Sequence, residues 1–326
     1  MKVPEGENAV PPTVLLVHGR GFKPASGDLL ELGTAAMAAG IARDCPDALQ
    51  AFLGCDKRIG YYGDLSNDLL ARGGAHYDGS LDLSDRKRAL QELRALTRRK
   101  HFGVRRYDRL PGKSALPEFA ADIGAPLLGA MGLGSLLVGR VAADLQEYWN
   151  EAGNYTARVR ERVRSAIMHA LDGGGRLLLV SHGTGCIVSY DVLWQLSHDE
   201  EYAPRYGRWK IDQWLTLGAP LGDSMVRRRL LGARERGRAR YPTNVLVWQN
   251  VSAEDDFMCH DNTIRNDFKS MLKLRLISAI HDYHIHNLAV RYGRSDPHSS
   301  IGYLIHPRVS KIVVDWLRAA DGAAGA

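Results

Sequence analysis

Residues 177–192 read LLLVSHGTGCIVSYDV, and this order of residue types restricts the fold more than any other feature of the chain. A short leucine and valine run without polar alternation is typical of a strand that is buried on both faces, as in a parallel sheet. The run ends in a glycine-rich turn, and an apolar helical pattern follows at residues 186–197. A strand, a tight turn and a helix in this order predict one unit of an α/β fold.

The same sequence of a strand, a turn and a helix recurs along the chain. The run VLLVH at residues 14–18 precedes the turn GRG at residues 19–21, and residues 28–40 have a helical pattern. We expect further strands at residues 58–65, 177–181, 213–217 and 244–250, and further helices at residues 84–100, 148–171 and 307–317. Because strand and helix alternate, we expect one α/β domain over residues 1–326, with a mainly parallel central sheet and helices on both faces.

Residues 123–139, IGAPLLGAMGLGSLLVG, interrupt this alternation with seventeen uncharged residues, of which five are glycine. A membrane-spanning helix needs about 20 apolar residues, and glycine and Pro126 weaken an isolated helix. We therefore expect residues 112–145 to form a helical lid or cap over a pocket. Contact of the 123–139 segment with a membrane surface or lipid is the second interpretation.

The formal net charge of +6 comes largely from arginines in residues 227–229 and 234–240. Such clusters are more often solvated than ligand-binding, and no nucleic-acid-binding motif accompanies them, so we expect no nucleic-acid partner. A basic protein that binds nucleic acid or an anionic surface stays open as an alternative class. The four cysteines show no C-x-x-C spacing, and residues 1–13 lack the apolar core of a signal peptide. These features favour a cytoplasmic protein with free thiols.

Five short motifs together resemble the α/β-hydrolase family, in particular its esterases and lipases. They are VLLVHGRG at 14–21, VSHGTG at 180–185, TLGAP at 216–220, EDDFM at 254–258 and DPHSSIGYL at 296–304. Their order matches the family's order of nucleophile, acid and histidine. HGRGFKP, residues 18–24, is also similar to a signature of uncharacterised bacterial members. The resemblance implies an apolar acyl substrate, such as a carboxylic ester, and no cofactor.

The resemblance also implies a role for particular residues. Asp256 matches the acid that orients the histidine, with Asp255 as a close rival, and His298 matches the general base. Gly183 stands at the position of the nucleophile. The oxyanion N–H groups are expected near Gly19, Arg20 and Thr184, and His18 and His182 are expected to line the pocket. Ser299 and Ser300, beside His298, are expected to act as helix caps or loop hydrogen-bond formers.

Gly183 has no side chain that could attack a substrate. Ser181 ends the strand too early to reach the apex, Cys186 lies inside the helix, and Thr184 is better placed to supply an N–H group. Glycine tolerates the strained apex backbone, so the turn can persist without its nucleophile. Three interpretations stay open: a pseudoenzyme that binds a ligand, a serine-to-glycine variant of an active enzyme, or a site in which His298 activates water directly.

A metal site is the remaining alternative. The run HDYHIH at residues 281–286 places His284 and His286 on one face of a strand, and His260 and Asp261 lie nearby in sequence. Histidine and carboxylate at such spacing can bind zinc or iron. No complete metal-hydrolase motif is present, however, so we expect no catalytic metal.

Overall fold

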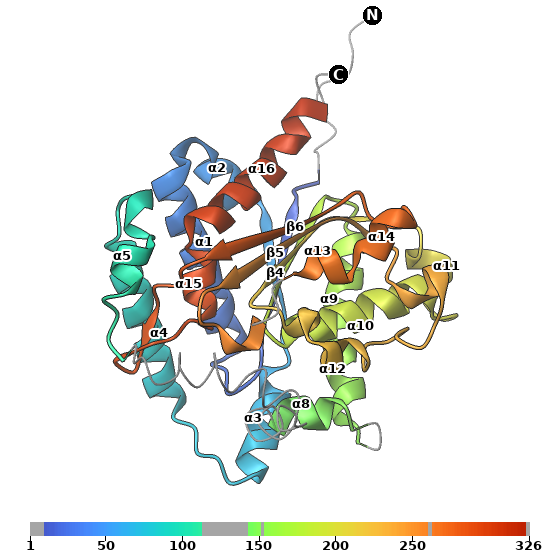
Figure 1. The fold of residues 1–326 in the computed structure, drawn as a ribbon, viewed down its shortest axis with the longest axis horizontal. Helices are drawn as coiled ribbons and strands as arrows, with labels where there is room; N and C mark the ends of the chain where they lie inside the picture. The colour runs from blue at the N-terminus through green and yellow to red at the C-terminus, as the bar shows by residue number, and fades with distance from the viewer. Residues whose placement is uncertain (1–9, 113–142, 151–152, 260–262, 324–326) are drawn as a thin grey trace, which may run out of the picture.

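Six strands form one sheet at the centre of the computed structural model (Figure 1). The structure describes residues 10–112, 143–150, 153–259 and 263–323. The strand order is β2-β1-β3-β4-β5-β6, and every neighbouring pair is parallel, which confirms the expected mainly parallel sheet. The strands are β1 (Thr13–Val17), β2 (Asp56–Gly60), β3 (Leu177–His182), β4 (Ile211–Leu217), β5 (Val245–Ala253) and β6 (Ala279–Ile285).

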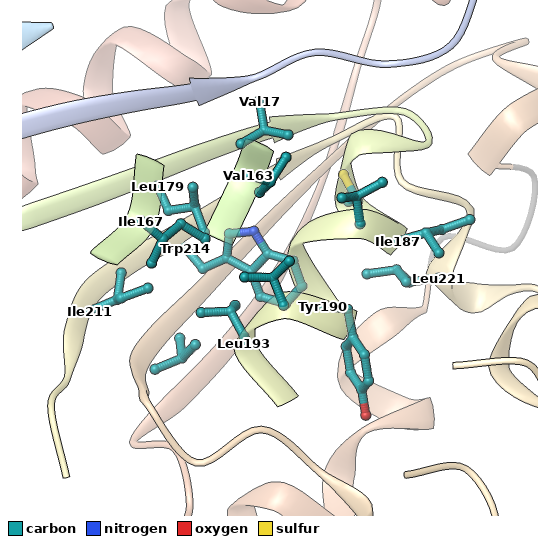
Figure 2. Packing of buried hydrophobic residues seen from close by; sticks show 14 of the residues in the cluster. Val17, Val163, Ile167, Leu179, Ile187, Tyr190, Leu193, Ile211, Trp214 and Leu221 are labelled. Atoms are coloured by element: carbon teal, nitrogen blue, oxygen red, sulfur yellow. The ribbon is translucent and has the colours of Figure 1, made fainter. Parts of the chain in front are cut away.

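Helices cover both faces of the sheet. Successive strand side chains point to opposite faces, so Val17 packs on the face covered by α9 (Tyr155–Asp172) and α10 (Gly185–His198). Leu16 packs on the other face, which α1 (Ser26–Asp44), α15 (Ser300–Leu304) and α16 (Pro307–Ala323) cover. Figure 2 shows the first of these two cores, where Trp214 of β4 lies among aliphatic side chains of β3, α9 and α10. The expected helical layers on both faces are therefore present.

Shorter elements connect these layers. The helices are α2 (Leu49–Gly54), α3 (Gly63–Arg72), α4 (Gly79–Arg94), α5 (Val104–Tyr107), α8 (Ala143–Tyr148), α11 (Ala203–Tyr206), α12 (Ser224–Arg227), α13 (Ile264–Asp267) and α14 (Lys269–Lys273). Strands β7 (Val290–Arg291) and β8 (Arg294–Ser295) form a separate antiparallel pair. Single 3₁₀ turns lie at Pro46–Ala48, Arg99–His101, Pro220–Gly222, Gly237–Arg240 and Phe257–Cys259. In the part of the chain that the structure describes, no helix is both long and apolar enough to cross a membrane.

Four element predictions need correction. The strand expected at residues 58–65 is β2, which ends at Gly60, because α3 begins at Gly63. The helix expected at residues 84–100 is α4, which begins at Gly79 because the Asp78 side chain caps it by accepting the N–H groups of Ser80 and Leu81. The helix expected at residues 148–171 is α9, which begins only at Tyr155, and Tyr148 is the last residue of the preceding helix α8. The sheet also has a sixth strand, β6, whose polar sequence suits an edge that pairs only with β5.

The lid prediction concerns a part of the chain that is not described. The expected lid at residues 112–145 falls mostly on residues 113–142, and the segment 123–139 falls wholly on them. Residues 113–142 lie outside the described residues, so the lid and its lipid contact stay predictions.

The carboxyl ends of the parallel strands meet at one edge of the sheet, where ligands bind in open α/β sheets. Gly19 follows β1, Gly183 follows β3, Gly218 follows β4 and Asp256 follows β5. This edge therefore brings together segments that are far apart in the sequence, among them parts of four of the five motifs that carry the resemblance.

Candidate active site

Gly183 lies at the sharp turn between β3 and α10, which begins at Gly185. Its φ of 54° is in the left-handed region, which favours glycine. The Gly183 N–H donates to the Leu217 carbonyl at 2.9 Å, and its own carbonyl accepts the Cys186 N–H at 3.0 Å. A Cβ on Gly185 would collide with the His18 carbonyl. The turn therefore packs closely against the residue that follows β1.

His298 and Asp256 meet beside this turn. The His298 Nδ1–H lies 2.9 Å from both carboxylate oxygens of Asp256, so Nδ1 carries the proton and Nε2 is left as an acceptor. The Asp256 side chain is fully buried, and it also accepts the Tyr303 hydroxyl at 2.6 Å and the Met258 N–H at 3.0 Å. A carboxylate held in this way orients the imidazole and stabilises its protonated form.

Asp255, the rival acid, points elsewhere. Its carboxylate accepts the Tyr107 hydroxyl, and its φ is 60°. This left-handed residue turns the chain after β5, so the two neighbouring carboxylates face different partners. Asp256 is therefore the one that meets His298.

The space above Gly183 is filled by the imidazole of His298. A Cβ placed on Gly183 would lie 2.8 Å from His298 Nε2 and 3.1 Å from Cε1. Among the described residues, Nε2 is buried without a hydrogen-bond partner. Gly218 leaves room for the pair, because a Cβ there would lie 2.7 Å from Asp256 Oδ2 and 3.1 Å from His298 Nδ1. Nε2 of His298 therefore points at the position of a Cβ on residue 183. The ring lies closer to that position than a serine side chain would allow.

Two side chains hold the loop of His298: Asn287, which the sequence did not single out, and His182, which it did. The buried amide of Asn287 donates to the carbonyls of Pro297 and Ser299 at 2.8 and 2.9 Å. The carbonyl of His298 itself accepts His182 Nε2–H at 2.9 Å. Three successive carbonyls are therefore fixed. No sequence signal marks Asn287, because it reaches this loop only through the tertiary fold.

Three backbone N–H groups near Gly183 are candidates for binding an oxyanion. Gly19 Cα lies 3.7 Å from the position of a Cβ on Gly183, which places the loop after β1 beside the turn. Thr184 directly follows Gly183 and stands before α10. Among the described residues, no acceptor is recorded for the N–H groups of Gly19, Arg20 and Thr184. Uncommitted donors at this place are what a developing oxyanion requires.

The two expected pocket histidines differ in exposure, since His18 is buried and His182 is partly buried, but burial lowers the pKa of both. His18 Nδ1–H donates to the Gly19 carbonyl at 2.9 Å, and Nε2 accepts the Tyr62 N–H at 3.1 Å. Burial, aided by the charge of Lys23, lowers the pKa of His18 to about 3. Burial likewise lowers the pKa of His182 well below its ordinary value. Both histidines line a cavity of about 40 Å³ that lies beneath α1, α4 and α15.

The alternative nucleophiles have other partners. The Ser181 hydroxyl is fully buried between the Ser189 hydroxyl at 2.8 Å and Trp214 Nε1–H at 3.0 Å. Burial raises the pKa of the Cys186 thiol, which donates to the Ser181 carbonyl. Ser299 precedes α15 at the cap position, but its hydroxyl makes no capping hydrogen bond. None of these side chains takes the place of a nucleophile at residue 183.

Two further interpretations concern a metal site and the basic segment. Within the described ranges, no group of three or more histidine, cysteine or carboxylate side chains is arranged to hold a metal, and His260 and Asp261 lie outside those ranges. His284 is in β6 and His286 follows it, where its ring stacks on Tyr107. The basic segment 227–240 is mostly exposed, and Leu230 anchors it in the core.

Comparisons with known proteins add no relative. No protein-family model matches the chain, and neither the curated proteins nor the solved structures searched contain a match.

Proposed function

We propose that the protein is an α/β-hydrolase-type protein whose site is arranged for acyl transfer on a carboxylic ester and lacks only the nucleophile. The observation that carries the proposal is the aim of His298 Nε2, which is oriented by Asp256 and lies 2.8 Å from the position of a Cβ on Gly183. The N–H groups of Gly19 and Thr184, which lie beside the same turn, support the same function. Nucleophile position, base, acid and oxyanion donors are the complete set of parts for this reaction.

Each part would perform one step if a serine stood at residue 183. His298 Nε2 would take the hydroxyl proton as the oxygen attacked the ester carbonyl, and Asp256 would stabilise the resulting imidazolium. The N–H groups of Gly19, Arg20 and Thr184 would donate to the carbonyl oxygen as it became negative. His298 would then protonate the departing alkoxide, and a water molecule activated by the same ring would release the acid.

With glycine at residue 183, the same parts favour ligand binding as the second candidate function. The specific observation is that the imidazole already fills the space of the missing side chain, since Nε2 and Cε1 lie 2.8 and 3.1 Å from the Cβ position. A site that had kept room for a nucleophile would hold the ring further away. In this function the protein binds an ester or acid without cleaving it.

Covalent labelling tests the proposal. An aryl fluorophosphonate reacts with an activated serine, so we expect the Gly183→Ser variant to be labelled at residue 183 and the protein with glycine to stay unlabelled. Adding His298→Ala to Gly183→Ser should abolish the labelling, because the base is lost. A folded Gly183→Ser variant that reacts with neither the phosphonate nor short-chain esters would refute the acyl-transfer site and leave ligand binding as the function.

A further inference from the structure

Arg86 is a nearly buried cation whose hydrogen-bonding capacity is mostly unused. It lies on α4, and its side chain is 12% exposed. Its Nε–H donates to Asp82 Oδ2 at 2.8 Å. Among the described residues, no acceptor is recorded for Nη1 or Nη2. Four N–H donors of a planar guanidinium are therefore available next to the core.

The acidic neighbours of Arg86 do not need these donors. Asp82 also accepts from Arg291 at 2.6 Å, from the Tyr77 hydroxyl at 3.0 Å and from the Tyr292 hydroxyl at 3.1 Å. Asp85 is bound by Arg291 and Arg88. Three guanidinium groups thus serve two carboxylates, which leaves an excess of positive charge at Arg86. Pairing with Asp82 alone therefore does not explain why an arginine is present at residue 86.

The unused donors belong to a residue of the candidate site. Arg86 lines the cavity of about 40 Å³ together with His18 and His182. The ring of His182 lies 4.5 Å from the ring of His298, measured between centroids. The charges of Lys23 and Arg86 both contribute to the lowered pKa of His182. His182 therefore borders both the cavity and His298, and the nearby charges are positive.

The size and the charge of this cavity define the group that fits it. Apart from Ser300, the remaining lining is apolar and comes from β1, β2, β3, β4, α1 and α15. A volume of this order accommodates a group of only a few heavy atoms. A carboxylate matches the planar fork of an arginine through two parallel hydrogen bonds. Burial raises the pKa of the nearby Asp296 carboxyl, whereas the charges of His298 and Arg291 lower it.

We propose that Arg86 binds the carboxylate of a small organic acid, and that the ligand of this site is a short half-ester with one free carboxylate and one ester group. The inference that the ligand is a half-ester rests on the proposed function, because that function assigns the ester group to the position beside His298. The carboxylate rests on Arg86 alone. Arg86 is thereby a specificity-determining residue that selects an anionic ligand over a neutral one.

Calorimetric binding to the protein with glycine at residue 183 tests the proposal without any turnover. The probes are monomethyl succinate, which has one carboxylate, and dimethyl succinate, which has none. We expect the monoester to bind at least about tenfold more tightly, as a charge-assisted bidentate pair provides. Arg86→Gln should remove this preference, and Arg86→Lys should restore it only in part because lysine lacks the fork. The control Arg88→Gln, which changes a more exposed arginine on the same helix, should keep it.

Each outcome decides a separate question. Equal binding of the two esters, or a preference that survives in a folded Arg86→Gln variant, would overturn the assignment of Arg86. Equally tight binding of inorganic phosphate would replace the carboxylate by a general oxyanion and also overturn it. A Gly183→Ser variant that never reacts refutes the proposed function but leaves the charge preference measurable. Circular dichroism shows whether Arg86→Gln is folded, and Asp82 keeps three other partners in that variant.

Discussion

Replacing Gly183 by serine perturbs both the backbone and the imidazole of His298. The φ of 54° would hold a residue with a Cβ in the left-handed region, at a cost of about 1–2 kcal/mol. The new Cβ would stand 2.8 Å from His298 Nε2, closer than carbon and nitrogen atoms approach without bonding. The ring must therefore retreat by about 0.5 Å or more to reach van der Waals contact.

The retreat is resisted by the contacts that hold His298. Its Nδ1 is 2.9 Å from both oxygens of Asp256, and Asn287 and His182 fix the loop on either side of the ring. We expect Gly183→Ser to lower the free energy of unfolding by about 2–3 kcal/mol in total. Gly183→Ala introduces the same Cβ without the hydroxyl, so it is the matched control. Serine should be the more stable of the two by about 1 kcal/mol if its hydroxyl bonds to Nε2.

Urea denaturation and ester hydrolysis measure the two consequences. On a short-chain aryl ester, we expect Gly183→Ser to exceed Gly183→Ala by at least about 100-fold, since the base and the oxyanion donors act only through a nucleophile. Equal rates for two folded variants, together with equal stability, would show that the hydroxyl never meets Nε2. The geometry described for His298 would then be refuted as a nucleophile-activating arrangement.

Three further outcomes are expected elsewhere in the chain. In urea denaturation, Gly302→Ala should destabilise the protein by about 3 kcal/mol or more, because its Cβ would collide with the Asn287 side chain. The control Gly27→Ala should be neutral or stabilising, because a Cβ there has no neighbour within 4 Å. Asn287→Ala should cost about 2–4 kcal/mol by unpairing buried carbonyls and should speed amide hydrogen exchange around His298; unchanged exchange would contradict the bracing role. The pKa of buried His306 is lowered to about 3, so the unfolded chain binds a proton below about pH 6.5 that the folded protein does not. Stability should therefore fall as pH decreases from about 6.5 towards 3, by up to about 1.4 kcal/mol per pH unit for this group, and His306→Asn should flatten that slope.

The sequence predicted those features of the fold and the site that depend on the local pattern of residues. Apolar runs located β1, β3, β4 and β5, and glycine turns follow the first three of these strands. The order of the motifs singled out Gly183, Asp256 and His298, which the fold brings together. The boundaries of β2 and α4 were wrong because they depend on where the chain turns and on which residue caps the helix. Edge strand β6 has too little apolar pattern to be recognised as part of the sheet.

Long-range contacts account for the remainder. Asn287 and Arg86 reach the site from segments whose sequences show no motif, and the motif that contains Tyr303 does not show that its hydroxyl bonds to Asp256. Only the fold reveals these contacts. The choice between Asp255 and Asp256 also depended on a backbone angle, since the left-handed Asp255 turns its carboxylate toward Tyr107. Two adjacent residues of the same type cannot be distinguished by sequence pattern alone.

The order of the strands has a consequence for how the protein is synthesised. Strand β1 pairs on one side with β2, but on the other side Thr13 pairs with Leu177, far along the chain. The ribosome must therefore synthesise the chain as far as β3 before the interior of the sheet can form. Until then the apolar run VLLV of β1 has no partner on that side. Such non-local pairing folds slowly and leaves a nascent strand open to aggregation. Chaperone binding to nascent chains should accordingly be strongest before β3 emerges and should decline once it has.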